Sequence, residues 1–358
     1  MIELVKPAKP NQIKINTYLA QILETGYYTN NGPLVQELES HLAKILDVNH
    51  VLFTSNGTVS LELALKSINA KGNIITTPYS YVATANAAHW LGLDVRFADL
   101  LDNSFFPCPS KIESLIDQNT SALLITQVYG LVGPLEDYVS LAAKYNIPLI
   151  LDAAHAFGVT YKGKSVSSYG DLASFSFHAT KVFHTVEGGA IVTNRPELRE
   201  RLFNLRSFGH RGDQYLTEGI NAKNSEVHAA FGLAQLDQIQ ESLTNRKRIF
   251  DLYVSSLTFN GYVPLKIPVE LDWNYCYFPL LFDDSAKKEA LKEYLLEEGI
   301  MSRRYFYPAL NTLGQFKPSH CPVAEDLASK VLCIPHYAAL KADEQSYIID
   351  TINKFTEK

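Results

Sequence analysis

The sequence predicts an α/β fold, in which a large domain holds a mostly parallel sheet between helices and a smaller α+β domain follows at the C-terminal end. From about residue 50, short apolar runs alternate with amphipathic stretches of helical length, a rhythm typical of βαβ units. The 358 residues are 46% hydrophobic and 20% charged, a balance that supplies a full core. At about 150 residues per domain, this length suggests two domains.

Five apolar runs are the expected strands of this sheet, because strands separated by helices of about 10–15 residues indicate βαβ units and a mostly parallel sheet. They are residues 51–55, 73–77, 94–99, 121–130 and 147–155. Helical patterns separate several of them, at residues 58–68, 81–91 and 135–145.

The rhythm changes after Asp152. Residues 172–177 and 188–194 are two strand-like runs with no segment of helical length between them. One long helical stretch, about 224–250, then leads to a C-terminal unit of α+β character. We therefore predict a large domain over residues 1–240 and a smaller domain over residues 241–358.

Composition excludes several classes of function. With 32 Lys and Arg against 38 Asp and Glu, the net charge of −6 argues against a nucleic-acid partner. No apolar run approaches the roughly 18 residues of a membrane span, and the N-terminus does not resemble a signal peptide. Four scattered cysteines form no C-x-x-C pair, and no spacing of His, Asp and Glu suggests a metal site. The expected location is the cytoplasm.

One motif suggests a nucleotide triphosphate site. The segment from Gly158 through Gly163, Lys164 and Ser165 matches the P-loop pattern G-x-x-x-x-G-K-[ST]. A P-loop must open a helix, whereas residues 166–170 lead into another strand-like run. We therefore interpret this segment as a turn. No G-x-G-x-x-G follows a strand, so a dinucleotide cofactor has no support either.

Polar segments follow five of the expected strands. In open α/β sheets, ligands bind beyond the carboxyl ends of the strands, so one shared pocket would explain all five. The segments are Ser55–Thr58, Pro78–Tyr81, Gln127–Tyr129, Asp152–His155 and Ser176–Lys181.

Asp152 and Lys181 are the strongest candidates for chemistry. Asp152 ends an apolar strand, and Lys181 is flanked by apolar residues, where a lysine has a lowered pKa and becomes a candidate nucleophile. Pyridoxal phosphate needs such a lysine, an acid for its ring nitrogen and a phosphate cup. Taken alone, Asp152 fits a helix N-cap or an ion pair equally well, and Lys181 a surface lysine.

The phosphate cup is expected at Ser55–Thr58. This segment lies between a strand and a helix, so backbone N–H groups and a hydroxyl meet at a helix N-terminus. Ordinary N-capping is compatible with the same geometry. The three features occurring together in this order favour a site for pyridoxal phosphate.

Longer stretches around these residues resemble the DegT/DnrJ/EryC1/StrS sugar aminotransferases nearly from end to end. The resemblance implies the aspartate-aminotransferase architecture, which is fold type I of the enzymes that use pyridoxal phosphate. Its most specific stretches are SNGTVSLELAL (55–65), TTPYSYVATANAA (76–88), LDAAHAFG (151–158), GDLASFSFHATKVFHTVEGGAIV (170–192) and GINAKNSEVHAAFGLAQL (219–236).

The resemblance also implies roles for individual residues. Lys181 would bind the cofactor covalently, and Asp152 would pair with the pyridine nitrogen. Gly57 and Thr58 would hold the phosphate with the help of the Ser176 hydroxyl.

Three further positions complete the implied cofactor site. Tyr81 would stack on the pyridine ring. His155 stands where relatives usually carry Gln, near the ring hydroxyl. Asn221 would reach the phosphate of the neighbouring subunit, which implies a homodimer with shared active sites; from the residues alone, Asn221 is a loop residue before a helix.

The implied reaction moves an amino group from L-glutamate to a dTDP-linked keto sugar. Within the family, the chain is most similar to enzymes that convert dTDP-4-dehydro-6-deoxy-D-glucose to dTDP-4-amino-4,6-dideoxy-D-glucose, a precursor of surface polysaccharide such as O-antigen. A C3 aminotransferase acting on a dTDP-3-keto-6-deoxyhexose is the nearest alternative. A regulatory protein that binds pyridoxal phosphate without catalysis is a third.

A short segment of the smaller domain is the expected substrate-binding region. Arginine suits the diphosphate, and tyrosine suits base stacking or hydroxyl contacts. A surface basic pair beside core aromatics is the alternative interpretation. The residues are Arg303, Arg304, Tyr305 and Tyr307.

Overall fold

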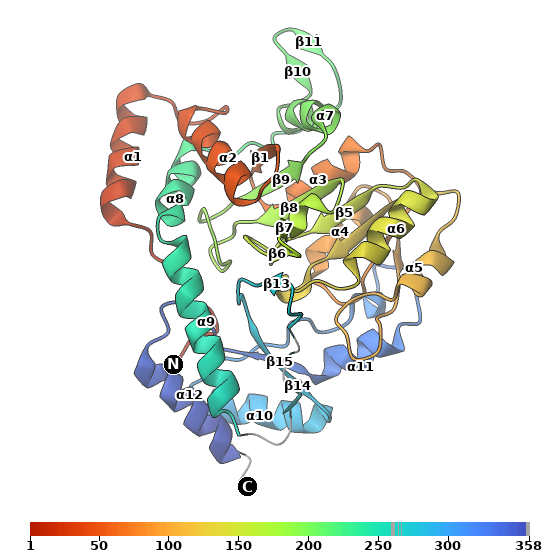
Figure 1. Cartoon of the computed structure of the whole chain (residues 1–358). Helices are drawn as coiled ribbons and strands as arrows, with labels where there is room; N and C mark the ends of the chain where they lie inside the picture. Colours follow the sequence, from red (N-terminus) through yellow and green to blue (C-terminus); the bar gives the residue numbers. More distant parts are fainter. Residues whose placement is uncertain (259–261, 264, 266, 356–358) are drawn as a thin grey trace.

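A seven-stranded sheet forms the centre of the molecule (Figure 1). The computed structural model describes residues 1–258, 262–263, 265 and 267–355. The strand order is β1-β9-β8-β5-β4-β2-β3, and all strands are parallel except β9, which is antiparallel to both of its neighbours. The strands are β1 (His50–Thr54), β2 (Asn73–Thr76), β3 (Asp94–Phe97), β4 (Thr120–Thr126), β5 (Leu149–Asp152), β8 (Leu172–Ser176) and β9 (Gly189–Thr193).

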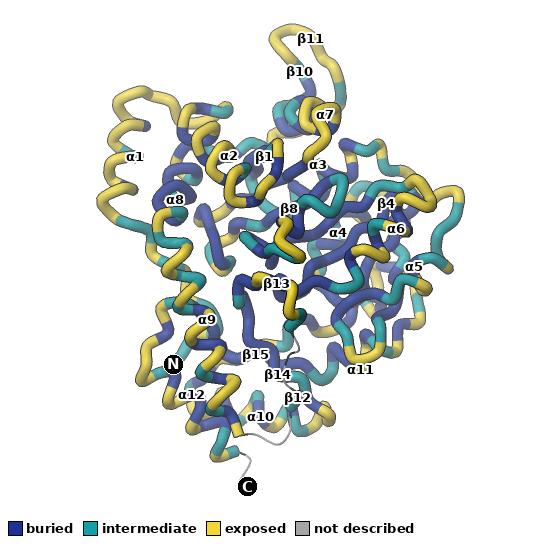
Figure 2. The backbone as a smooth tube through the Cα atoms, viewed as in Figure 1, coloured by how far each residue is buried: buried dark blue, intermediate teal, exposed yellow. Residues whose placement is uncertain are grey.

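These strands could be recognised in the sequence because helices cover the sheet. Strands buried on both faces appear as continuous apolar runs, and every residue of β2, β5 and β9 is buried (Figure 2). The two runs without a helix between them are the antiparallel pair β8 and β9. The prediction of a mostly parallel α/β sheet is confirmed.

The predicted helices are present, with bounds that agree to within one residue at each end. Those three are α3 (Gly57–Ser67), α4 (Val82–Trp90) and α6 (Leu135–Tyr145). The other helices of the large sheet and the N-terminal region are α1 (Gln12–Thr25), α2 (Pro33–Ile45), α5 (Pro109–Leu115) and α7 (Pro196–Arg206).

The single helical stretch predicted at about 224–250 is wrong, because the structure divides it. Helix α8 (Glu226–Leu236) ends before Asp237, and α9 (Ile239–Ser256) begins two residues later. Asp237 forms an ion pair with Lys14 of α1 at this break. Both halves carry apolar residues at helical spacing, so the sequence pattern continues across the break. Tertiary contacts determine where the break lies.

A smaller antiparallel sheet, of order β12-β14-β15, lies toward the C-terminal end. The predicted domain boundary at residue 240 remains a prediction; α9 begins at Ile239, and part of the predicted 241–358 domain lies outside the described residues. The elements are β12 (Tyr262–Val263), β14 (Phe278–Phe282), β15 (Val331–Ile334), α10 (Ser285–Glu297), α11 (Pro322–Lys330) and α12 (Ala342–Phe355).

The segment that resembles a P-loop is a hairpin. Strands β6 (Thr160–Tyr161) and β7 (Lys164–Ser165) pair antiparallel, and Gly163 adopts a φ of +73° in their turn. A single 3-10 turn, Val166–Ser168, follows instead of a helix. The predicted turn is confirmed. Strand β13 (Leu271–Asp272) extends this hairpin, and a second hairpin, β10 (His210–Arg211) with β11 (Gln214–Tyr215), projects beyond α7 (Figure 1).

A buried carboxylate joins the start of α2 to the start of α8. Glu226, at the start of α8, accepts the backbone N–H groups of Leu34 at 2.8 Å and Val35 at 3.0 Å. These donors belong to the first turn of α2, where backbone N–H groups have no partner within the helix. A Cβ atom on Gly32 would lie 2.6 Å from the carboxyl carbon of Glu226, so this close approach requires glycine.

Among the described residues, no helix is both long and apolar enough to cross a membrane. The same residues contain no group of three or more His, Cys, Asp and Glu side chains arranged to hold a metal ion.

Candidate active site

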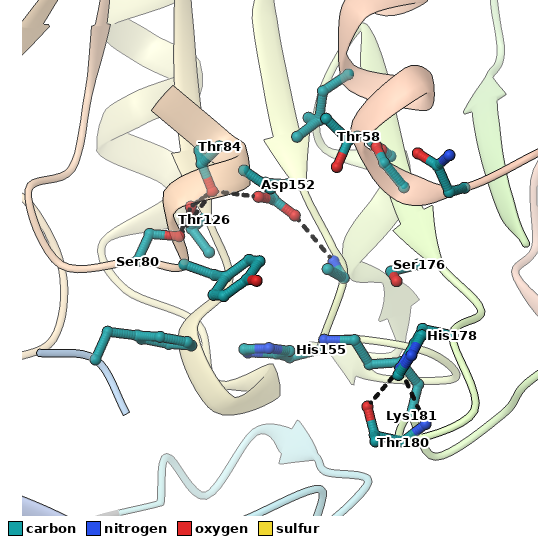
Figure 3. A pocket seen from close by; sticks show the side chains of 18 of the residues that line it. Thr58, Ser80, Thr84, Thr126, Asp152, His155, Ser176, His178, Thr180 and Lys181 are labelled. Atoms are coloured by element: carbon teal, nitrogen blue, oxygen red, sulfur yellow. Dashed lines mark hydrogen bonds between the residues drawn. The ribbon is translucent and has the colours of Figure 1, made fainter. Parts of the chain in front are cut away.

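A cavity of about 340 Å³ lies at the carboxyl edge of the parallel strands. It draws side chains from the ends of β4, β5 and β8 and from the first turns of α3 and α4 (Figure 3). The segment 303–306 also contributes to its lining. Of the twelve residues predicted for the site, nine line this cavity: Gly57, Thr58, Tyr81, Asp152, His155, Ser176, Lys181, Arg303 and Tyr305. The three that do not are Asn221, Arg304 and Tyr307.

One of the five predicted polar segments does not reach the cavity. Gln127 and Tyr129 are buried behind it, and β4 contributes Thr126 instead. The phenol hydroxyl of Tyr129 donates to the carbonyl of Tyr305, and its backbone N–H donates to His155 at 3.2 Å. This segment therefore holds residues that line the cavity in place, but it does not line the cavity itself.

Asp152 is placed by the end of β5, with a side chain buried in the cavity floor. Its Oδ2 accepts the hydroxyl of Thr84 at 2.6 Å, and its Oδ1 accepts the backbone N–H of Ala154 at 3.1 Å. Burial raises the pKa of Asp152 above its ordinary value, while these two hydrogen bonds and the nearby Lys181 oppose that rise.

Lys181 lies in the loop between β8 and β9, where its backbone N–H donates to His178 at 2.9 Å. The side chain enters the same cavity as Asp152. Burial lowers the pKa of Lys181 below its ordinary value, and the Asp152 carboxylate only partly offsets this. A lysine in this state gives up its proton readily and can act as a nucleophile.

The predicted phosphate cup lies on the opposite side of the cavity. Asn56 caps α3 by accepting the N–H of Val59 at 2.9 Å, which leaves the N–H groups of Gly57 and Thr58 at the open helix end. In the described part of the chain, neither the Thr58 nor the Ser176 hydroxyl has a hydrogen-bond partner. A Cβ on Gly57 would lie 2.9 Å from that of Ser176, so only glycine keeps this cup open.

His155 is held between aromatic rings. It stacks on Phe306 with ring centres 5.7 Å apart and meets Tyr277 edge-on at 5.0 Å. Burial holds the pKa of His155 well below its ordinary value, so the imidazole is neutral. Because Nδ1 accepts the N–H of Tyr129, the proton of the neutral ring resides on Nε2. His155 can therefore donate one hydrogen bond from Nε2.

The predicted substrate segment is divided between two environments. Arg303 lines the cavity, and its guanidinium lies 4.8 Å from the ring centre of Tyr305. Arg304 turns away, where it pairs with Glu289 at 2.8 Å and stacks over Tyr307 at 4.2 Å. The two neighbouring arginines therefore lie on opposite sides of this segment.

Asn221 lies away from the cavity of its own chain. It is exposed, and its backbone bridges to Ser207. Nearby exposed apolar side chains include Phe208, Ile220 and Val227.

A group of hydroxyls lies beneath Asp152; the sequence analysis included Ser80 in the predicted segment Pro78–Tyr81 but did not single out Thr84 or Thr126. Ser80, Thr84 and Thr126 all line the cavity and are almost completely buried. The signal lay inside the stretch TTPYSYVATANAA, where Ser80 and Thr84 stand four residues apart across the start of α4. Glu187, Tyr277 and Phe306 also line the cavity without having been predicted.

Comparisons with known proteins identify the family that the chain matches. The model of the DegT/DnrJ/EryC1/StrS aminotransferase family matches residues 11–353. A dTDP-4-amino-4,6-dideoxy-D-glucose transaminase of Shigella dysenteriae is 38% identical over 99% of this chain and 98% of its own length. A protein of the same name from Escherichia coli is 36% identical over 96% and 95%. The crystal structure of DesI in the presence of its TDP-sugar product superposes with a TM-score of 0.95 at 28% identity, covering 100% of this chain and 93% of that one.

Proposed function

Because the chain belongs to the DegT/DnrJ/EryC1/StrS aminotransferase family, we propose that it transfers an amino group from L-glutamate to C4 of a nucleotide-linked keto-deoxysugar. The preferred acceptor is dTDP-4-dehydro-6-deoxy-D-glucose, and the product is dTDP-4-amino-4,6-dideoxy-D-glucose. The observation that carries this proposal is that Asp152 and Lys181 line the same cavity. Two relatives that the chain matches over nearly its whole length are named dTDP-4-amino-4,6-dideoxy-D-glucose transaminase. The proposed location is the cytoplasm, since four scattered cysteines suit a reducing compartment.

Pyridoxal 5′-phosphate is the proposed cofactor of this aminotransferase, as in the PLP form of a putative sugar aminotransferase with the same fold. The cavity fits it, because two hydroxyls without partners among the described residues and two helix N–H groups meet where a phosphate would sit. Gly57, Thr58 and Ser176 are the proposed phosphate ligands. Tyr81 is proposed to stack on the ring. When bound, pyridoxal phosphate supplies an electron sink that stabilises negative charge on the carbon that loses its proton, and it carries the amino group between the two substrates.

The residues of the chain then have distinct tasks. Asp152 holds the proton of the ring nitrogen in place through its buried carboxylate. The neutral His155 donates from Nε2 to the ring hydroxyl. Lys181 first holds the cofactor and is then free as an amine, which moves a proton away from the α-carbon of glutamate. The same amine returns a proton to the sugar carbon in the second half of the reaction.

Arg303 is the proposed partner of substrate anions. Lys181 and Arg303 are the two lysine or arginine side chains among the described residues that line the cavity, and Lys181 is assigned to chemistry. Arg303 can pair with a carboxylate of glutamate or with the sugar diphosphate through parallel hydrogen bonds. Tyr305 stacks against it and lies where a nucleotide base could pack.

The active unit is proposed to be a homodimer. Asn221 is exposed outside its own cavity, and Phe208, Ile220 and Val227 expose apolar surface beside it. A second copy of the chain would cover these side chains and bring Asn221 to the phosphate of the neighbouring site.

An absorbance experiment tests this function. Purified protein is loaded with pyridoxal phosphate, and its visible absorbance is expected to disappear when L-glutamate is added. Candidate keto sugars are then added, and the acceptor is the one that restores the absorbance. Return with the dTDP-4-keto sugar alone supports C4 transfer, whereas return with the dTDP-3-keto isomer alone would contradict it. Failure to bind pyridoxal phosphate would remove the enzyme assignment altogether.

A further inference from the structure

A chain of buried hydroxyls ends on Asp152. The hydroxyl of Thr84 lies 2.6 Å from Oδ2 of Asp152, that of Ser80 lies 2.7 Å from Thr84, and that of Thr126 lies 3.0 Å from Ser80 (Figure 3). The three hydroxyl residues come from the β2–α4 connection, α4 and β4. Each is at most 3% exposed, so water does not compete for these hydrogen bonds.

The direction in which these three hydroxyls donate their hydrogen bonds depends on the charge of Asp152. If the carboxylate is ionised, it only accepts, so Thr84 donates to it, Ser80 donates to Thr84, and Thr126 donates to Ser80. Every hydroxyl proton then has an acceptor. If Oδ2 carried a proton, the order would reverse and the proton of Thr126 would need an acceptor. Ser80 would already donate to that hydroxyl, so among the described residues only Thr84 could accept its proton, at the longer distance of 3.4 Å.

A buried donor without a partner is costly, whereas an unused lone pair on a hydroxyl oxygen costs little. The network is therefore better satisfied in the direction of an ionised Asp152, because every hydrogen bond in that order is 3.0 Å or shorter, whereas the reverse order depends on the 3.4 Å contact. Hydrogen bonds in such a chain also strengthen one another in a low-dielectric interior. This favours the charged carboxylate at a position where burial alone would favour the neutral one.

We propose that Thr84 is a positioning residue that keeps Asp152 ionised and oriented toward the ring nitrogen of the cofactor, with Ser80 and Thr126 completing a chain of donors. This inference rests on the proposed function, because it needs pyridoxal phosphate in the cavity. Thr84 acts only through Asp152, so its contribution depends on the one cofactor atom that Asp152 faces.

That dependence provides the test. Thr84→Val keeps the shape of the side chain and removes the donor, and Thr84→Ser restores it. Dissociation constants are measured for each variant with pyridoxal 5′-phosphate and with its 1-deaza analogue, in which C–H replaces the ring nitrogen. We expect Thr84→Val to weaken binding of pyridoxal phosphate about tenfold, the scale of a lost hydrogen bond to a charge. Binding of the analogue should change less than about twofold, because the analogue has no ring nitrogen for Asp152 to pair with.

An equal loss with both cofactors would assign Thr84 a general structural role and overturn the proposal, as would no loss with either. Failure of Thr84→Ser to recover binding would also overturn it. Should Thr84→Val not fold, Ser80→Ala removes the middle donor and is expected to weaken binding of pyridoxal phosphate alone, by about threefold. An unchanged dissociation constant for Ser80→Ala would contradict the proposed chain of hydroxyl donors. If the wild-type protein binds neither cofactor, the proposed function itself has failed, an outcome distinct from all of these.

Discussion

The carboxylate of Asp99 accepts the backbone N–H of Ala324 at 3.0 Å and thereby joins the end of β3 to the first turn of α11. The same side chain accepts the N–H of Val323 at 3.2 Å and an ammonium hydrogen bond from Lys111 at 3.0 Å. Asp99 is 3% exposed although it is charged. It therefore caps a helix 225 residues away in the sequence and connects the large sheet to the C-terminal region.

Replacing this cap should destabilise the fold. Asp99→Asn keeps the shape but turns one acceptor oxygen into a donor facing other donors, so we expect a loss of about 2 kcal/mol in the free energy of unfolding. Denaturant unfolding at pH 7 measures it. Asp102→Asn, an exposed substitution three residues away, is the matched control and should leave stability unchanged. Equal effects of the two substitutions would contradict the role of Asp99.

The carboxyl group of Asp99 should also make the free energy of unfolding depend on pH. Burial pushes the pKa of Asp99 upward, but hydrogen bonds from Ala324, Lys111, Leu100 and Val323 outweigh it and hold the pKa below its ordinary value. A carboxyl with a lowered folded-state pKa stabilises the protein above its unfolded pKa of about 3.9, and this contribution is lost as the pH falls through the folded value. The stability difference between wild type and Asp99→Asn should therefore be constant from pH 7 to about 5 and shrink below about 4. A difference that persists undiminished at the lowest pH would exclude the carboxylate as its source.

Lys181→Ala should abolish amino transfer, with turnover lowered at least about 10³-fold, because it removes both the covalent attachment point and the proton carrier. The cofactor is still expected to bind through its phosphate. Turnover and visible absorbance are measured together. Lys164→Ala is the matched control, because Lys164 is exposed in the β6–β7 hairpin despite its P-loop-like sequence, and that variant should retain full activity.

The phosphate cup can be tested with two ligands. Thr58→Val and Ser176→Ala each remove a hydroxyl from the cavity, so each should weaken binding of pyridoxal 5′-phosphate by roughly tenfold. Pyridoxal, which has no phosphate, should bind the variants and the wild type equally in equilibrium titrations. A parallel loss for both ligands would place these hydroxyls elsewhere in the site.

Shared active sites predict recovery of activity on mixing. Asn221→Asp should inactivate by placing a negative charge beside the phosphate, and Lys181→Ala is inactive for its own reason. If Asn221 serves the neighbouring copy, a mixed dimer holds one site with both residues intact, so equal mixing with random exchange should restore roughly a quarter of wild-type activity. An Asn221 that serves its own chain would give no recovery, since every site would then carry one defect.

The central sheet was predictable because its strands are buried on both faces and are therefore mostly apolar. Strands buried on both faces are nearly continuous apolar runs, and β2, β4 and β5 are recognisable by the apolar residues at their centres. The carboxyl-end rule then placed Asp152 and Ser176 in one pocket without knowledge of side-chain directions.

Other parts of the site depended on contacts that a sequence pattern does not contain. Arg303 and Arg304 are chemically identical neighbours, and only the position of Glu289 on α10 decides which one turns from the cavity. The hydroxyls of Ser80 and Thr84 suit a helix start equally well, so their connection to Asp152 required the position of β5 beside α4.

The capping of α2 by Glu226 has a consequence for the order in which a newly made chain can fold. Strand β1 is at the edge of the described seven-stranded sheet and pairs with β9, which is made about 140 residues later. The first turn of α2 likewise waits for its acceptor until Glu226 has left the ribosome. During synthesis, the faces of α1 and α2 that pack on α8 therefore remain uncovered while β2, β4 and β5 can already assemble. Nascent chains from which Glu226 has not yet emerged should present these faces of α1 and α2 to chaperones.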